Sequence, residues 1–409
     1  MATIAVLGTL DTKGREHAFV SDRIRARGHA TLLIDVGTGG EPTVTPDIMR
    51  SEVAAAGGLD PAAVMALMAR GDRGECVSAM AAAAPRLLQR LAAEGRIQGV
   101  IALGGGGGTA IASAAMRALP IGFPKLIVST LASGNTAHYV GTTDITMMPA
   151  VVDVQGLNRI SRTILARAAG AISGMVEADV GLGDDKPVVV ASMFGNTTKC
   201  IEVAVPLLEE AGYEVLVFAA TGTGGRAMEA LIASGMVAGV LDITTTELAD
   251  ELVGGVLTAG PERLEAAARH GVPAVVAPGC LDMVNFGERQ TVPERFTGRT
   301  FSIHNPQVTL MRTTPEECAE LGRMVAAKVN ASRGPVSVLI PRLGISVISA
   351  PGGPFHDPAA DAALFTAIET SLRPDIPCTS HDCTINDPAF ARACVEALLA
   401  AMRKASVPT

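Results

Sequence analysis

Five consecutive glycines follow the apolar run of residues 100–103 and precede Thr109, where an alanine-rich helical pattern begins. A strand, a glycine turn and a helix start in this order leave backbone N–H groups free at the positive end of the helix dipole. Without Cβ atoms, an anion can approach those groups closely. We therefore expect a phosphate site whose residues are Gly104, Gly105, Gly106, Gly107, Gly108 and Thr109. A flexible turn is the alternative interpretation.

Two further loops place a lysine after a glycine turn and hydroxyl residues. One follows residues 4–7 and contains Gly8, Thr9, Asp11 and Lys13; the other follows residues 188–194 and contains Asn196 and Lys199. A lysine ammonium in this setting suits a phosphate oxygen, although for Lys199 a solvated helix start is the alternative. Neither loop has the Walker A pattern, and no acidic residue ends a strand about 20 positions after the glycine run, as a nicotinamide site requires. We therefore favour a mononucleotide.

A fourth loop, after residues 126–129, supplies hydroxyl and amide donors. Its candidate ligand contacts are Thr130, Ser133, Gly134 and Asn135. They could close over phosphates bound at the glycines, although such loops also occur as ordinary helix N-caps. Asp144 or Asp153 could offer a carboxylate to Mg²⁺, which prefers oxygen ligands. A simple turn residue is the alternative for Asp144.

The second half of the chain holds a separate set of polar residues at expected strand ends. Asp242 and Glu247 flank three threonines, and His304 lies beside Asn305. We predict catalytic roles for Asp242, Glu247 and His304, the histidine as general acid or base; an ordinary helix start and a structural histidine are the alternatives. The predicted substrate contacts are Asn196, Lys199, Thr245, Asp282, Asn285 and Asn305. No zinc spacing and no Gly-x-Ser-x-Gly hydrolase elbow is present.

Short apolar runs that alternate with longer helical patterns must position these residues. The runs cover residues 4–7, 30–34, 100–103, 126–129, 145–152, 188–192, 215–219, 240–243, 274–277, 301–303, 336–340 and 347–348. This alternation predicts an α/β fold with mostly parallel sheets, in which ligands bind beyond the carboxyl ends of the strands.

The polar, glycine-rich segment 181–187 predicts a boundary between two α/β subdomains, residues 1–180 and 186–405. Both halves contain a lysine loop after their first strand and the tetrapeptide Gly-Thr-Gly-Gly after their second, at residues 37–40 and 222–225. We interpret the halves as diverged copies of one unit with a ligand cleft between them. Convergence of common loop chemistry is the alternative.

Composition limits the partners of the chain. The net charge of −8, with 3% aromatic residues, argues against a nucleic-acid surface, whereas local amides and one lysine can hold a small anion. With 48% apolar residues the chain has ample material for a core. Seven scattered cysteines, no signal segment and no apolar run of about 20 residues predict a soluble, cytoplasmic protein without a membrane partner.

Nine stretches together resemble the family of the ATP-binding domain at the N-terminus of the tomato mosaic virus resistance protein and its uncharacterised bacterial relatives. They are residues 8–13, 104–109, 119–125, 129–141, 151–154, 222–229, 241–247, 281–287 and 304–305. The chain departs from the family pattern at Gly106, where Ser is common, and at Asn135, where Gln occurs.

This resemblance implies two Rossmann-like subdomains, ATP with Mg²⁺ as ligand, a homodimer or higher homo-oligomer, and a possible barrel-domain partner protein. We expect ATP on the glycine run and an enzyme that uses it on a small organic or sugar-derived acid. A non-catalytic nucleotide-sensing or protein-interaction module is one alternative. An isomerase or lyase acting on a phosphorylated small molecule is another.

Overall fold

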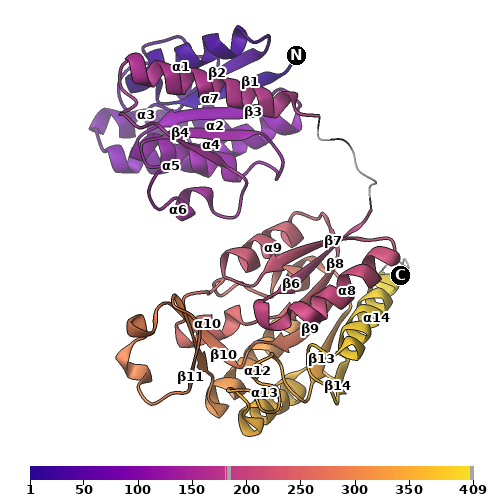
Figure 1. Ribbon diagram of the computed structural model, residues 1–409. Coiled ribbons are helices and arrows are strands. Elements are labelled where there is room, and N and C mark those ends of the chain that lie inside the picture. The colour runs from indigo at the N-terminus through magenta and orange to yellow at the C-terminus, as the bar shows by residue number, and fades with distance from the viewer. Residues whose placement is uncertain (180, 182–185, 406–409) are drawn as a thin grey trace. The chain divides into compact units, whose positions relative to one another are not determined.

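The computed structural model describes residues 1–179, 181 and 186–405. The chain divides into two compact units, Met1–Gly181 and Leu182–Thr409, and Figure 1 shows that each has its own sheet covered by helices. The main sheet of each unit is parallel, which confirms the predicted α/β class with two Rossmann-like parts. Of the predicted boundary segment, residues 182–185 lie outside the described residues.

The first unit is built on a five-stranded parallel sheet in the order β2-β1-β3-β4-β5. Its elements are β1 (Thr3–Gly8), α1 (Leu10–Arg25), β2 (Ala30–Asp35), α2 (Arg50–Ala56), α3 (Pro61–Arg70), α4 (Arg73–Ala93), β3 (Gly99–Gly104), α5 (Gly106–Arg117), β4 (Lys125–Ser129), α6 (Ala137–Val140), β5 (Thr146–Pro149) and α7 (Arg159–Glu177).

Successive residues of each central strand face opposite sides of this sheet, so one strand contributes to two cores. From β1, Ile4 and Val6 pack in a core with α1 and α7, whereas Ala5 and Leu7 pack in a core with α2, α4 and α5. Because both faces of the sheet are covered, the polar residues of the connecting loops collect at its edges, and those after each strand collect at the carboxyl edge.

The second unit is built on a six-stranded parallel sheet in the order β14-β13-β9-β8-β6-β7. Its strands and α-helices are β6 (Val188–Met193), α8 (Thr198–Glu210), β7 (Glu214–Ala219), α9 (Thr223–Ala233), β8 (Val237–Thr244), α10 (Glu247–Val253), α11 (Ala266–His270), β9 (Ala274–Gly279), β10 (Met283–Phe286), β11 (Phe301–Asn305), β12 (Val308–Arg312), α12 (Pro315–Asn330), β13 (Val336–Pro341), α13 (Pro358–Ser371), β14 (Cys378–His381) and α14 (Pro388–Ala405).

A three-stranded antiparallel sheet, β10-β12-β11, lies in the chain between β9 and α12. Only the strand at 301–303 was expected from the sequence. The two strands that were missed, β10 and β12, are buried but short, and polar residues such as Asn285 and Thr309 interrupt their apolar pattern. The strand expected at residues 347–348 is wrong: these two residues form a turn, where the backbone N–H of Val347 donates to the carbonyl of Asn196 at 3.3 Å.

The two parallel sheets share one strand order. Numbered within each unit, both read 2-1-3-4-5, and β14 adds a sixth strand to the second unit. The loops after β1, β2 and β3 therefore correspond in place to the loops after β6, β7 and β8. None of the helices described is long and apolar enough to span a bilayer.

Candidate anion-binding site

A pocket of about 580 Å³ lies at the carboxyl ends of β1, β2 and β3 in the first unit. Its lining residues come from the first turns of α1 and α5 with the residues just before them, from the loops after β2 and β5, and from α3, α4 and their connection. They are Thr9, Asp11, Thr12, Lys13, Thr38, Gly39, Met68, Gly71, Arg73, Val77, Gly105, Gly107, Gly108, Asp153 and Gln155. The strand order reverses between β1 and β3, which is where sheets of this order bind their ligands. The fold thus brings the Lys13 loop and the glycine run to one pocket.

The glycine run changes role along its length. Gly104 ends β3, Gly105 is the N-cap of α5, and α5 begins at Gly106. A Cβ on Gly104 would lie 2.8 Å from the backbone nitrogen of Thr109, so the tight turn itself requires glycine there. A Cβ on Gly106 would meet nothing within 4 Å. Gly105, Gly107 and Gly108 line the pocket, whereas Gly104 and Gly106, which were also predicted to contact the ligand, do not.

Thr109 does not line the pocket, although it was predicted to contact the ligand. It is buried, and its hydroxyl lies 2.7 Å from that of Ser129, so it joins α5 to the end of β4. Gly8 is also outside the lining, because it is occupied from behind by the ring of His17. Both residues support the turn instead of facing a ligand.

Two cations line the pocket. At Lys13 the backbone of α1 departs from helical geometry (φ −128°, ψ 22°), and the Lys13 ammonium donates to the carbonyl of Val154. An ammonium has three N–H donors, so two remain for a ligand. Arg73 is the first residue of α4, and its Nη2 lies 3.9 Å from the position of a Cβ on Gly107. Sequence reasoning missed Arg73 because it considered only residues that follow strands.

Two carboxylates line the same pocket. Asp11 accepts hydrogen bonds from the backbone N–H groups of Gly39 at 2.8 Å and Thr12 at 2.9 Å, which joins the loops after β1 and β2. Asp153, in the loop after β5, is exposed there. Among the residues that the structure describes, no group of three or more His, Cys, Asp or Glu side chains is arranged to hold a metal ion.

Asp144 lies elsewhere, and the prediction that it binds magnesium needs correction. One of its carboxylate oxygens lies 2.7 Å from the ammonium of the buried Lys125, and the other accepts the N–H of Gly122 at 2.8 Å. Both oxygens therefore have donors within the protein, and the residue is outside the lining of the pocket. Asp144 therefore neutralises the charge of the buried Lys125.

The hydroxyl loop after β4 lies next to the glycine turn. The N–H of Thr130 donates to the carbonyl of Gly104 at 3.2 Å, and the Asn135 side chain accepts the N–H of Ala137 at the start of α6. The four residues predicted to contact the ligand are exposed, but none belongs to the pocket lining: Thr130, Ser133, Gly134 and Asn135.

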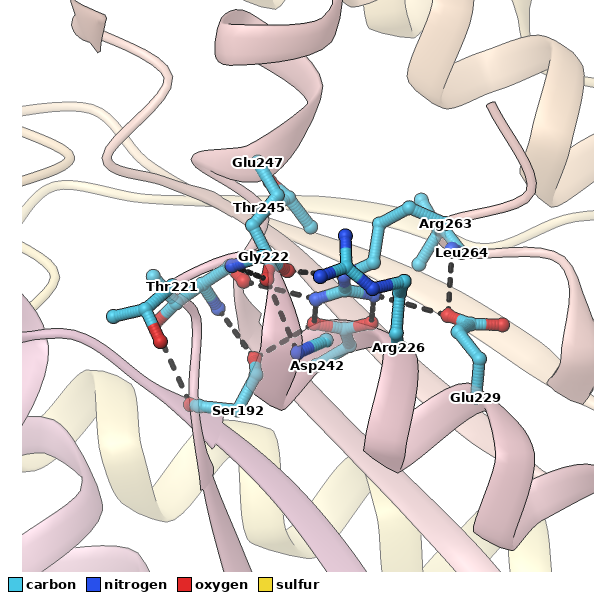
Figure 2. Close-up of polar contacts among 12 residues, drawn as sticks. Ser192, Thr221, Gly222, Arg226, Glu229, Asp242, Thr245, Glu247, Arg263 and Leu264 are labelled. Carbon is cyan, nitrogen blue, oxygen red and sulfur yellow. Dashed lines mark hydrogen bonds and ion pairs between the residues drawn. The ribbon is translucent and has the colours of Figure 1, made fainter. Parts of the chain in front are cut away.

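In the second unit, Asp242 and Glu247 surround a buried arginine, as Figure 2 shows. The Arg263 guanidinium lies 2.5 and 2.7 Å from the two oxygens of Asp242, and 2.5 Å from Glu247. Burial raises the pKa of Glu247, and the adjacent Arg263 opposes that rise. Asp242 and Glu247 are 1% and 0% exposed. We therefore correct their predicted catalytic role, because a substrate cannot reach carboxylates that are enclosed and paired.

Glu247 has a second set of contacts. Its Oε1 accepts the backbone N–H groups of Gly222 at 2.6 Å and Gly225 at 3.1 Å, at the N-terminus of α9. Glu247 is the first residue of α10, after the third strand of its unit, and Gly106 is the first residue of α5, after the third strand of the other. A protein carboxylate thus occupies the helix N-terminus that follows the second strand of the second unit.

His304 and Asn305 lie on exposed positions of β11 in the antiparallel sheet. Asn305 accepts the N–H of Gln307 at 2.9 Å, a local turn contact. Thr245, by contrast, is buried and donates to the carbonyl of Ala277. The structure does not bring His304 together with Asp242 or Glu247, so the predicted catalytic group does not assemble.

The other residues predicted to contact the substrate do not form a common surface either. Lys199 is exposed on α8, whereas Asn196 is buried, with its Nδ2 3.8 Å from the sulfur of Met283. Asp282 accepts the hydroxyl of Ser346 at 2.8 Å, and burial raises its pKa to about 6. Asn285 donates to Asp250 at 2.6 Å. Asp282 and Asn285 are both fully buried, which places them in the interior and not on a substrate surface.

Comparison with known proteins assigns both units to one family. Residues 2–180 match the N-terminal domain, and residues 186–402 the C-terminal domain, of the uncharacterised protein family UPF0261. A UPF0261 protein of Clostridium tetani is 49% identical over 98% of this chain and 99% of its own length. The ToMV resistance protein Tm-1(GCR237) of Solanum lycopersicum is 38% identical over 96% of this chain, which spans 55% of that protein.

The similarity to solved structures is much weaker. The UDP-N-acetylglucosamine 2-epimerase from Rickettsia bellii aligns over 98% of this chain and 97% of its own, with 12% identity and a TM-score of 0.22. A score this low carries no inference about ligand or chemistry.

Proposed function

This chain belongs to the UPF0261 family, and we propose that its first unit binds ATP in the pocket at the ends of β1 and β3. One observation carries the proposal: the open glycine turn, Lys13 and Arg73 line a single pocket at the point where the strand order reverses. A helix N-terminus with free amides, an ammonium and a guanidinium is a donor set suited to phosphates.

In this proposal the triphosphate lies on the amides of Gly105, Gly107 and Gly108, between Lys13 and Arg73. The helix dipole of α5 adds about half a positive charge at that position. The apolar side chains of Met68 and Val77 line another part of the pocket and would pack against the base. A volume of about 580 Å³ is within the range of small-molecule pockets.

The two carboxylates of the pocket fit a magnesium ion bound with the nucleotide. Asp11 and Asp153 would repel phosphates at close range, whereas Mg²⁺ is commonly held by one or two carboxylates together with substrate phosphates. Asp11 already accepts two backbone N–H groups, so Asp153 is the residue we assign to the ion or to its water shell. Mg²⁺ would supply charge neutralisation of the phosphates.

The proposal is limited to binding. The expected reaction on a small organic or sugar-derived acid depended on Asp242, Glu247 and His304. Asp242 and Glu247 are paired with Arg263 in the interior, and His304 lies on the separate antiparallel sheet. Nucleotide binding by the first unit does not need those residues. A phosphorylated small molecule would use the same phosphate end of the pocket, and it is the competing occupant in the test.

The test is calorimetric titration of the full chain with ATP, ADP, AMP and inorganic phosphate, each with and without Mg²⁺. We expect ATP to bind most tightly and only when Mg²⁺ is present. Lys13→Met should weaken ATP binding about 10- to 100-fold, the effect of losing a hydrogen bond to a charged group. Lys199→Met, which removes the exposed lysine of the corresponding loop in the second unit, is the matched control. Absence of ATP binding in the wild-type chain would refute the proposal.

A further inference from the structure

His17 lies in the second turn of α1 and is fully buried, behind the pocket. Its ring Nδ1 is 2.7 Å from the carbonyl oxygen of Lys13, where the helix departs from regular geometry. A carbonyl oxygen can only accept, so Nδ1 carries the hydrogen. Burial lowers the pKa of His17, which favours the neutral ring, whereas its contacts with the backbone of Lys13 and Leu7 oppose that shift. The ring therefore donates one hydrogen bond, to the residue whose side chain enters the pocket.

The fold makes room for this ring at a specific glycine. A Cβ on Gly8 would lie 1.9 Å from His17 Nε2, which no real contact allows. Gly8 ends β1, immediately before the loop that lines the pocket. The backbone of Gly8 and the carbonyl of Lys13 thus enclose the imidazole from two sides.

The neighbouring residue on α1 fixes the loop that Lys13 contacts. The carboxylate of Glu16, which is buried, accepts the N–H of Gly156 at 2.5 Å. Val154, whose carbonyl accepts from the Lys13 ammonium, lies between the pocket residues Asp153 and Gln155. Glu16 and His17 therefore hold the two ends of the contact between Lys13 and this loop.

We propose that His17 is a positioning residue, which sets the direction of Lys13 into the anion pocket by a hydrogen bond to the Lys13 carbonyl. The proposal rests on the proposed function only for its consequence, which is affinity for a phosphate group. The position of Lys13 itself exists without a ligand and can be measured directly.

The first measurement uses the six lysines of the chain. Reductive ¹³C-methylation of the full-length protein gives one NMR signal for each lysine, and Lys13→Arg assigns the signal of Lys13. His17→Leu removes the donor, whereas His17→Asn offers an amide N–H near the position of Nδ1. We expect the Lys13 signal to move towards the free-lysine position in His17→Leu and to stay near the wild-type position in His17→Asn.

The matched control is His29→Leu. His29 is another buried histidine of the first unit, 2.8 Å from Glu177 and outside the pocket lining. It should leave the Lys13 signal unchanged even if it lowers the unfolding temperature. An unchanged Lys13 signal in His17→Leu, or an equal change in His29→Leu, overturns the proposal whatever the ligand proves to be.

The second measurement is ATP and AMP affinity. If His17 acts through Lys13, His17→Leu weakens ATP binding about tenfold or more, affects AMP less, and adds little in the Lys13→Met background because the two changes share one interaction. Equal loss for ATP and AMP, or full additivity, would indicate a merely structural histidine. A wild-type protein that binds no ATP refutes the proposed function, and the NMR result still decides the role of His17.

Discussion

The carboxylate of Glu247 accepts the backbone N–H of Gly222 at 2.6 Å, and so occupies the N-terminus of α9 from inside the protein. In the corresponding position of the first unit, after the third strand, the chain has Gly106 and an open turn. The two units share a strand order but differ at this residue. Glu247 supplies a carboxylate to the loop after β7, whereas in the first unit the N–H groups of Gly37 and Gly39 after β2 donate to Asp35 and Asp11. Residue 106 itself has no side chain and leaves open space at the start of α5.

This difference predicts that a carboxylate at residue 106 closes the pocket of the first unit. In Gly106→Glu the side chain has open space at the start of α5, and residue 106 lies between the pocket residues Gly105 and Gly107. It should lower ATP affinity at least about 100-fold, because it competes for the donors and repels phosphates. Titration calorimetry measures the loss.

Two controls separate charge from bulk in this experiment. Gly106→Gln has nearly the same size without the charge and should lose less affinity. Gly174→Ala adds a Cβ in open space on α7 and should lose none. If Gly106→Glu binds ATP as the wild type does, the phosphates do not lie at this turn.

Removal of Arg263 should destabilise the second unit without affecting the ligand of the first. Arg263→Met leaves Asp242 and Glu247 buried without their cation, and loss of one partner from a buried ion cluster costs about 3–5 kcal/mol. Urea unfolding can follow this unit alone, because in a Tyr139→Phe background Tyr213 is the remaining tyrosine of a chain without tryptophan.

The exposed Arg269 provides the comparison, since it forms ion pairs with Glu262 and Glu265 near the surface. Arg269→Met should change the free energy of unfolding by less than about 1 kcal/mol. Similar losses for the two arginines would contradict a structural role for the buried cluster.

Asp250 should make the second unit less stable as the pH rises. Burial raises the pKa of Asp250 from 3.8 to about 7. A carboxyl group with a higher pKa in the folded state takes up a proton on folding. Its contribution is therefore present in full below about pH 4 and is lost as the pH rises through about 7. Over this range the stability of the wild type should fall relative to Asp250→Asn by a few kcal/mol.

Urea unfolding at pH 4.5, 6 and 8 tests this dependence. In the variant, Asn285 can turn its amide so that its oxygen, which lacks a partner among the described residues, accepts from the new Asn side chain. As a control, Asp382→Asn changes an exposed residue, and its free energy of unfolding should change with pH as that of the wild type does. Parallel curves for Asp250→Asn would show that Asp250 is not the titrating group.

The proposed magnesium site predicts different effects for the replacement of two aspartates, Asp153 and Asp144. Asp153→Asn should weaken the Mg²⁺ dependence of ATP affinity, because Asp153 lines the pocket. Asp144→Asn should leave it unchanged and lower stability, because it leaves the buried Lys125 without its carboxylate. Mg²⁺ titrations at fixed ATP, with thermal unfolding of the same samples, compare the two. A larger change in Mg²⁺ dependence for Asp144→Asn would reverse the assignment.

Local sequence patterns were sufficient to find two segments that contribute residues to the pocket lining. The glycine run and the Lys13 loop were found from the sequence because strand ends and glycine turns are local signals, and parallel strands gather their ends at one edge. Arg73 gave no such signal, since it begins a helix that follows another helix. Only the packing of α4 against α5 places it beside Gly107.

The sequence by itself determined the α/β class, the two units and the glycine turn, because hydrophobic period and turn chemistry act over a few neighbouring residues. The tertiary structure alone decided which polar side chains are accessible. Asp242 lies near the end of β8, and Glu247 and Asp11 follow β8 and β1. The first two are nevertheless paired with the buried Arg263, while Asp11 lines a pocket. Burial and pairing depend on partners brought together across the fold, such as Arg263 for Asp242 and Gly39 for Asp11.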